Sequence, residues 1–308
     1  MITLKQLRYL DALAEASHFG RAAEQVGISQ PALSAQIRDL EARLGVELVE
    51  RHPGGARLTA TGVEIAQRCA RVLADVREIE DMARKRAGAF AGPLRLGIIP
   101  SIAPFLLPRL LPEITARYPE VDLTLRETLT GNLMRELVAG ELDLVIASLP
   151  LDHPQVETAD AYTEAFMLVA ASPAGAASPA GATGLAGGEE EPLPLSALAD
   201  QRVLLLEDGH CLRDQVLQAC GNSLAGSRRG GGATSLATLV ELVANGQGVT
   251  LVPEMYAHGM LGREARVRTA RFTAPEPHRR VALAWRRTHP QAARFGELRD
   301  LVAQCAPR

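Results

Sequence analysis

The sequence lacks long apolar runs and is poor in cysteine. No uninterrupted apolar run approaches the roughly 20 residues that a membrane-spanning helix needs. No N-terminal segment combines a charged start with an apolar centre, as a secretion signal does. We therefore expect a cytoplasmic protein without a membrane partner. Four cysteines in 308 residues are too few for a disulfide scaffold, and a reducing compartment keeps such thiols free unless they serve catalysis or sensing.

An excess of charge of one sign is also missing. The net charge of −3 gives no hint of a nucleic-acid partner. The first 58 residues contain seven Lys or Arg and seven Asp or Glu. Any DNA affinity of this segment must therefore come from local placement of Arg38, Arg51 and Arg57, since phosphate contacts carry much of it. The remaining composition, 47% hydrophobic and 22% charged, is ordinary for a globular protein with two or three domains.

The N-terminal segment has the pattern of a helix-turn-helix. Leucines between residues 4 and 13 recur at helical spacing, and a second short helix over residues 21–26 ends at Gly27. Ser29 and Pro31 favour the start of a third helix that runs to residue 44. In a helix-turn-helix the second of two such helices enters the DNA major groove. A plain helical bundle remains the alternative from pattern alone.

A long helix is predicted next, because residues 59–87 contain no proline and a single glycine. Apolar residues alternate three and four positions apart, which is typical of a coiled-coil seam between two chains. These residues are Val63, Ala66, Cys69, Leu73, Val76, Ile79 and Ala83. We interpret Cys69 as a small packing residue of this stripe, and Cys305 as a packing residue of the last helix.

After residue 93, strand-like runs alternate with helical periods, which predicts an α/β fold with mainly parallel sheets. Strands are expected at residues 94–99, 121–126, 142–147, 166–171, 202–206, 248–252 and 281–285. Helices are expected at residues 104–117, 131–139, 234–245 and 290–304. Ligands in such sheets bind beyond the carboxyl ends of strands, here Pro100-Ser101, residues 128–130 and residues 207–211. An Ala/Gly/Pro/Ser-rich tract at 172–198 predicts a mobile surface loop.

The stretch EDGHCLRDQVLQAC, residues 207–220, follows one of these strands and places two cysteines nine residues apart. If residues 212–219 form a helix, Cys211 and Cys220 lie roughly 13 Å apart along its axis. A disulfide tolerates a Cα separation of about 7 Å at most. The helix and a bond between these two cysteines are therefore mutually exclusive, which is the geometry of a redox switch.

The string RAAEQVGISQPALSAQIRDLEARLGVELVER, followed by LTATG, resembles the winged helix-turn-helix of LysR-type transcriptional regulators. The resemblance implies a wing over residues 46–58, and base-facing positions at Gln30, Pro31, Ser34 and Ala35. Arg38 and Arg51 would then face phosphates of double-stranded promoter DNA.

The family resemblance also implies a multidomain α/β organisation. A winged helix-turn-helix (1–58) and a dimerising linker helix (59–90) precede a periplasmic-binding-protein-like regulatory domain of two α/β subdomains. Subdomain I would comprise 91–171 and 279–308, and subdomain II, with the redox cysteines, would comprise 172–278. Pairs of dimers would form homotetramers.

Within this family, LEDGHCLRDQ with a cysteine nine residues downstream resembles the hydrogen-peroxide-sensing OxyR branch. Further matching stretches are GPLRLGIIPSIAPFLLP, ATSLATLVELVANGQGVTLVP and APEPHRR. The resemblance implies a peroxidatic Cys211, a resolving Cys220, and a peroxide surrounded by Ser101, Thr130, His210 and Arg279. The branch usually has threonine at the position of Ser101, so a hydroxyl is kept and a methyl is lost. It also implies control of oxidative-stress genes, contact with RNA polymerase and resetting by a thiol reductant, without a metal or cofactor.

Two other functions compete with this interpretation. The cleft of the regulatory domain could bind a small organic anion non-covalently, with the cysteines as bystanders. A thiol peroxidase fused to a dimerisation helix is the third hypothesis, but a turnover enzyme needs no DNA reader, so the N-terminal segment argues against an enzyme. The residue types suit peroxide sensing, because a thiolate attacks the O–O bond and the resulting sulfenic acid condenses with a second thiol.

Overall fold

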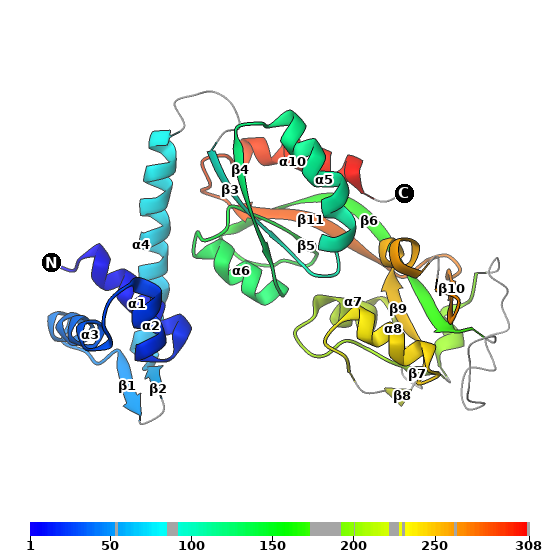
Figure 1. Cartoon of the computed structure of the whole chain (residues 1–308), viewed down its shortest axis with the longest axis horizontal. Helices are drawn as coiled ribbons and strands as arrows, with labels where there is room; N and C mark the ends of the chain where they lie inside the picture. Colours follow the sequence, from blue (N-terminus) through cyan, green and yellow to red (C-terminus); the bar gives the residue numbers. More distant parts are fainter. Residues whose placement is uncertain are drawn as a thin grey trace. The chain divides into compact units, whose positions relative to one another are not determined.

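The computed structural model describes residues 1–52, 55–84, 92–172, 192–199, 201–221, 228–229, 232–261 and 264–306 of the chain. The chain divides into two compact units (Figure 1), one containing the N-terminal helices and one containing most of the α/β part. Residues 173–191 of the low-complexity tract and residues 85–91 after the linker helix lie outside the described residues.

The first unit contains three helices and a hairpin, followed by one long helix. Its elements are α1 (Leu4–Ala16), α2 (Phe19–Val26), α3 (Gln30–Leu44), β1 (Val49–His52), β2 (Gly55–Leu58) and α4 (Ala60–Arg84). Local sequence explains the start of α3: the Ser29 side chain accepts a hydrogen bond from the Ala32 N–H, and Pro31 lies in the first turn. Gly27 ends α2 with a φ of 71°. The predicted helix-turn-helix and its wing are thus confirmed.

Helix α4 uses its apolar stripe in two ways. Ala66 and Cys69 are buried in the first unit's own core with Leu10 and Leu13 of α1. Val63, Val72 and Ile79 instead remain 43%, 43% and 66% exposed. The prediction of one continuous seam between two chains is therefore wrong for Ala66 and Cys69, because α1 already covers that side of the helix. The Ala83 side chain lies outside the described part of the chain.

A seven-stranded sheet forms the frame of the second unit, in the order β10-β6-β11-β5-β3-β4 with β9 also paired to β6. Its strands are β3 (Gly92–Ile98), β4 (Val121–Glu127), β5 (Leu144–Ser148), β6 (Val156–Ala171), β9 (Thr250–Pro253), β10 (Val267–Ala270) and β11 (His278–Arg286). A separate parallel pair consists of β7 (Arg202–Val203) and β8 (Arg228–Arg229).

Helices cover this sheet at both ends of the long strands. Figure 1 shows α5 and α10 near β3 and β4, and α7 and α8 near β9. The helices are α5 (Ala103–Arg117), α6 (Thr130–Val138), α7 (Cys211–Cys220), α8 (Leu236–Ala244), α9 (Glu254–Tyr256) and α10 (Ala292–Cys305), with a 3-10 turn at Leu195–Leu198 and a π turn at Ala257–Leu261. One buried cluster joins the end of β6 with α7, α8 and β9.

The prediction of mainly parallel sheets is wrong for the seven-stranded sheet. Strands β3, β4 and β5 pair in parallel, but β11 runs antiparallel to both β5 and β6. Strand β11 lies between β5 and β6 and runs opposite to both. Strand β6 is also longer than predicted, because it has 16 residues and begins ten residues before the predicted start at residue 166. Its first half is mostly polar and only its first residue is buried, so no apolar run marks it as a strand.

None of the helices in the described ranges is long and apolar enough to cross a membrane. In the same ranges, no His, Cys, Asp and Glu residues gather in a group of three or more that could hold a metal ion.

We predict that Gly62→Ala destabilises the first unit. A Cβ atom at Gly62 would lie 2.1 Å from the Leu48 carbonyl oxygen, so the backbone must shift, at a cost of about 1–3 kcal/mol in the free energy of unfolding. Thermal unfolding of the full chain measures the change. Gly296→Ala in α10 is the control, because its Cβ meets no atom within 4 Å and a helical alanine stabilises by about 0.5–1 kcal/mol. An unchanged unfolding temperature for Gly62→Ala contradicts the prediction.

Candidate functional site

Cys211 is the first residue of α7, and the chain enters this helix through a tight turn. Gly209 adopts a φ of 93° in that turn, a backbone conformation that residues other than glycine rarely adopt. His210 precedes the helix, and its side chain makes no capping hydrogen bond. The first backbone N–H groups of α7 are therefore not satisfied by the His210 side chain, and the positive end of the helix dipole lies beside the Cys211 sulfur.

A small cavity adjoins Cys211. It measures about 20 Å³, which exceeds the roughly 10–15 Å³ needed to hold one water molecule. Three chain segments meet around it: the end of β3, the start of α6 and the start of α7. The lining residues are Ile99, Pro100, Ser101, Leu129, Thr130, His210, Cys211 and Leu212. The structure thus brings together four residues that the sequence singles out, namely Ser101, Thr130, His210 and Cys211.

Two hydroxyl groups of this cavity differ in their hydrogen bonding. The Ser101 hydroxyl accepts a hydrogen bond of 2.8 Å from Nη1 of Arg279. The Thr130 hydroxyl is buried and has no hydrogen-bond partner in the described part of the chain. A buried polar atom without a partner costs free energy, so the cavity is suited to a small molecule that offers hydrogen bonds.

Arg279 lies behind Ser101 and is not among the residues that line the small cavity. Arg279 is only 2% exposed. Nε donates to Oε2 of Glu164 over 2.8 Å, and Nη2 donates to the Ser101 carbonyl oxygen over 3.2 Å. A weaker contact of 3.9 Å joins Nη2 to the sulfur of Met255. Of the residues that the family resemblance implies around a peroxide, Arg279 is therefore the one that reaches the cavity through another residue.

Sequence reasoning missed Glu164, which is 6% exposed. Its carboxylate pairs with Arg279 through one oxygen and accepts a 2.8 Å hydrogen bond from the Met255 N–H through the other. Glu164 and Arg279 are direct cross-strand partners of β6 and β11. No local pattern links two residues 115 positions apart, so only the register of these strands identifies the pair. Burial, followed by the charge of Glu164, also raises the pKa of Tyr162 on the same strand.

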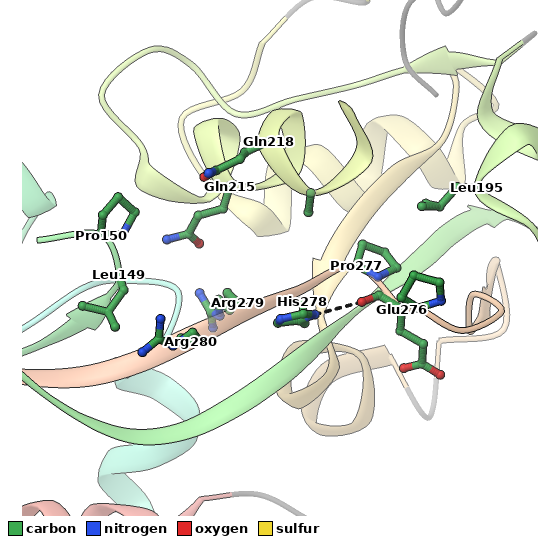
Figure 2. Close-up of a pocket in the computed structure, with 12 residues that line it drawn as sticks. Leu149, Pro150, Leu195, Gln215, Gln218, Glu276, Pro277, His278, Arg279 and Arg280 are labelled. Atoms are coloured by element: carbon green, nitrogen blue, oxygen red, sulfur yellow. Dashed lines mark hydrogen bonds between the residues drawn. The ribbon is translucent and has the colours of Figure 1, made fainter. Parts of the chain in front are cut away.

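A larger cavity of about 540 Å³ lies between α7 and the beginning of β11 (Figure 2). Gln215 and Gln218 of α7 line one side, and His278 and Arg280 of β11 line the other. Its size is that of a small-molecule site. The guanidinium groups that face it are already paired, however, because Arg279 binds Glu164 and Arg280 forms an ion pair with Asp160.

Cys220 ends the helix that Cys211 begins. All four thiols are free, and Cys220 is buried while Cys211 is partly exposed. The two are nine positions apart along the helix, which is roughly 13 Å of axial rise. Burial raises the pKa of Cys220 to about 11. The predicted separation is therefore present, and the helix has to unwind before the two sulfur atoms can meet.

The predicted DNA-contacting residues lie on the outer side of α3 and on the wing. Gln30, Pro31, Ala35 and Arg38 are exposed, and Ser34 is partly exposed. This arrangement leaves α3 accessible along the positions that a recognition helix uses.

Arg51 of β1 connects the wing to α3. Its guanidinium donates a 2.7 Å hydrogen bond to the Ser34 hydroxyl and lies 5.0 Å from the centre of the Phe19 ring. A phosphate contact by Arg51 therefore competes with these internal contacts.

We predict that Cys211 is the thiol that alkylating reagents modify first in the reduced protein. At pH 8, roughly one Cys220 in 1,000 is a thiolate, given its pKa of about 11. Cys220 should react at least about 10-fold more slowly than Cys211, because the thiolate is the nucleophile and Cys220 is also buried. Timed iodoacetamide labelling followed by peptide mass spectrometry measures both rates. Labelling in urea, where the difference should vanish, is the control, and equal rates in the folded protein contradict the prediction.

Two family models match successive parts of the chain. The family model described as "Bacterial regulatory helix-turn-helix protein, lysR family" matches residues 4–63. The model "LysR substrate binding domain" matches residues 87–306. A "Probable hydrogen peroxide-inducible genes activator" of Streptomyces viridosporus is 41% identical over 297 residues, which are 96% of this chain and 92% of the relative.

Two solved structures cover nearly the whole chain. Full-length OxyR of Pseudomonas aeruginosa, with one cysteine replaced by aspartate, has a TM-score of 0.74 at 33% identity. The match covers 99% of this chain and 96% of the Pseudomonas chain. Hydrogen-peroxide-bound OxyR of Corynebacterium glutamicum, a cysteine-to-serine mutant, has a TM-score of 0.63 at 32% identity. This match covers 98% of this chain and 92% of the Corynebacterium chain. A relative from Escherichia coli, 34% identical over 301 residues, is named a "DNA-binding transcriptional dual regulator OxyR". The chain belongs to the LysR family of bacterial helix-turn-helix regulators, and its similarity runs to the OxyR proteins of that family.

Proposed function

We propose that this protein regulates transcription in response to hydrogen peroxide, through reversible formation of a Cys211–Cys220 disulfide. One observation carries the proposal: Cys211 begins the helix that Cys220 ends, and a cavity of about 20 Å³ adjoins Cys211. The relatives named as peroxide-inducible activators and the peroxide-bound OxyR structure support it.

The first chemical step is attack of the Cys211 thiolate on one peroxide oxygen. The new S–O bond forms as the O–O bond breaks, and sulfur supplies the electron pair. The second oxygen leaves as hydroxide and becomes water when it takes a proton. Ser101, Thr130 and His210 are the proposed hydrogen-bonding partners of the peroxide, because these residues line the cavity. Arg279 would act through its hydrogen bonds to Ser101.

The second step joins the two cysteines. The Cys220 sulfur attacks the sulfenic acid of Cys211, a disulfide forms, and the hydroxyl leaves as water with the Cys220 proton. Because the bond and α7 exclude each other, this step unwinds the helix. A thiol reductant returns the protein to the reduced state.

We further propose how this change reaches DNA. The N-terminal unit would read double-stranded promoter DNA through Gln30, Pro31, Ser34 and Ala35 of α3, with Arg38 and Arg51 on phosphates. The exposed apolar residues of α4, Val63, Val72 and Ile79, are suited to pairing with a second copy. The proposed assembly is a homodimer or homotetramer in the cytoplasm. The disulfide would change how it binds promoters of oxidative-stress genes, where it contacts RNA polymerase.

The proposed domain boundaries are those expected from the family. They are 1–58 for the DNA-binding domain, 59–90 for the linker, 91–171 with 279–308 for regulatory subdomain I, and 172–278 for subdomain II. The buried cluster of α7, α8 and β9 supports a separate core for the second subdomain, and this core also takes in residues 166–170 at the end of β6.

A second candidate is a regulator that binds a small organic anion without covalent chemistry. The cavity of about 540 Å³ beside α7 favours it by size. The arginines in its wall are already paired with Glu164 and Asp160, which makes this candidate weaker than peroxide sensing.

We predict that brief exposure to substoichiometric hydrogen peroxide produces a Cys211–Cys220 crosslink. Peptide mass spectrometry of the non-reduced protein detects the linked pair, and Cys211→Ser should abolish it. Cys305→Ser is the matched control, because Cys305 is buried in α10 outside the small cavity and its loss should leave the crosslink intact. A peroxide-treated protein whose Cys211 stays reduced overturns peroxide sensing and favours the non-covalent ligand.

We also predict that Arg38→Ala weakens DNA binding without a change in sequence preference. Arg38 is exposed on α3, and loss of one phosphate contact should reduce the slope of log K against log salt by about 1. Binding titrations at several salt concentrations measure the slope. Arg117→Ala, an exposed arginine of α5, is the control. An unchanged slope for Arg38→Ala would rule out a phosphate contact at this position.

A further inference from the structure

The hydrogen bond between Arg279 and Ser101 has a fixed direction. A guanidinium carries only donors, so Nη1 of Arg279 must donate and the Ser101 hydroxyl oxygen must accept at 2.8 Å. The same guanidinium donates to the Ser101 carbonyl oxygen through Nη2. Ser101 is thus held by its main chain and by its side chain, and its hydroxyl oxygen cannot turn away from Arg279 without losing a charge-assisted bond.

The proton of the Ser101 hydroxyl remains available as a consequence. No acceptor for it is found among the residues that the structure describes, and Ser101 lines the small cavity beside Cys211. A hydroxyl that accepts from a cation on one side is a better donor on the other, because successive hydrogen bonds polarise one another. The hydroxyl is therefore set as a donor to whatever occupies the cavity.

Glu164 determines where the Arg279 guanidinium lies. One carboxylate oxygen accepts from Nε of Arg279 at 2.8 Å, and the other accepts from the Met255 N–H at 2.8 Å. The Met255 bond anchors the carboxylate to the main chain after β9, so Glu164 is not free to follow Arg279. With Nε occupied, the two terminal nitrogens of Arg279 point to Ser101.

We propose that Glu164 is a positioning residue for the reaction at Cys211: by holding Arg279, it directs the Ser101 hydroxyl as a hydrogen-bond donor into the cavity. The inference rests on the proposed peroxide chemistry. When the Cys211 thiolate attacks, negative charge develops on the departing hydroxide, and a preoriented donor stabilises that charge. Glu164 touches neither the peroxide nor Cys211, and its effect passes through Arg279 and Ser101.

Glu164→Gln tests the proposal in the full-length reduced protein. It keeps the shape of the side chain but removes the charge that orients Arg279. The rate constant for Cys211 oxidation by hydrogen peroxide should fall by on the order of 10²-fold, the scale of a misplaced reacting group. Alkylation of Cys211 by iodoacetamide needs no donor for a departing hydroxide. Its rate should therefore stay near that of the wild type.

A double-mutant cycle separates positioning from general damage. Ser101→Ala should slow oxidation as Glu164→Gln does, and the double variant should be no slower than Ser101→Ala alone. Multiplying losses would show that Glu164 does not act through Ser101 and overturn the proposal. Equal losses in oxidation and alkylation would also overturn it, because they indicate a merely structural role.

Two further variants complete the experiment. Glu164→Asp keeps the buried ion pair if Glu164→Gln fails to fold, and its shorter side chain should still draw Arg279 from Ser101 and slow oxidation selectively. Tyr162→Phe is the matched control, since this strand neighbour has a buried hydroxyl without a hydrogen-bond partner among the described residues, and its oxidation rate should equal that of the wild type. A reactive wild type with an unchanged Glu164→Gln overturns this inference alone. A wild-type Cys211 no faster than free cysteine overturns the proposed function with it.

Discussion

The site beside Cys211 depends on the buried ion pair between Arg279 and Glu164. Arg279 is 2% exposed, and a buried guanidinium is tolerated only when its donors are satisfied. Arg279 reaches this condition with Glu164 on β6 and with both the hydroxyl and the carbonyl of Ser101 after β3. The pair also joins β6 and β11, whose register places Glu164 opposite Arg279. The same strand register therefore positions the guanidinium that binds the Ser101 hydroxyl.

The second constraint concerns the length of α7. Cys211 and Cys220 terminate a helix whose inner side is buried, so joining them removes both backbone hydrogen bonds and packing. Driving a two-state change from 1:99 to 99:1 takes about 5.5 kcal/mol, and about 30 mV of reduction potential corresponds to 1.4 kcal/mol for a dithiol couple. Chemistry at sulfur therefore operates on an energy scale sufficient to refold one short helix.

Features set by neighbouring residues were predictable from the sequence, whereas contacts between elements far apart in the chain were not. Ser29 and Pro31 mark the start of α3, because capping acts within a few residues. The apolar spacing of α4 is equally visible, yet it does not say that Ala66 packs inside its own chain while Val72 stays exposed. The early part of β6 escaped prediction for a related reason: pairing with β11, rather than an apolar run, makes those polar residues a strand.

The sequence by itself determined the three N-terminal helices, the helix between Cys211 and Cys220, and hence the incompatibility of that helix with a disulfide. These features follow from capping, periodicity and rise per residue, all of which act along the chain. Only the tertiary structure decided that Arg279 stands behind Ser101 and that Glu164 holds it. Those contacts join residues 115 and 178 positions apart, and they exist because strand register and burial bring together groups that no local pattern connects.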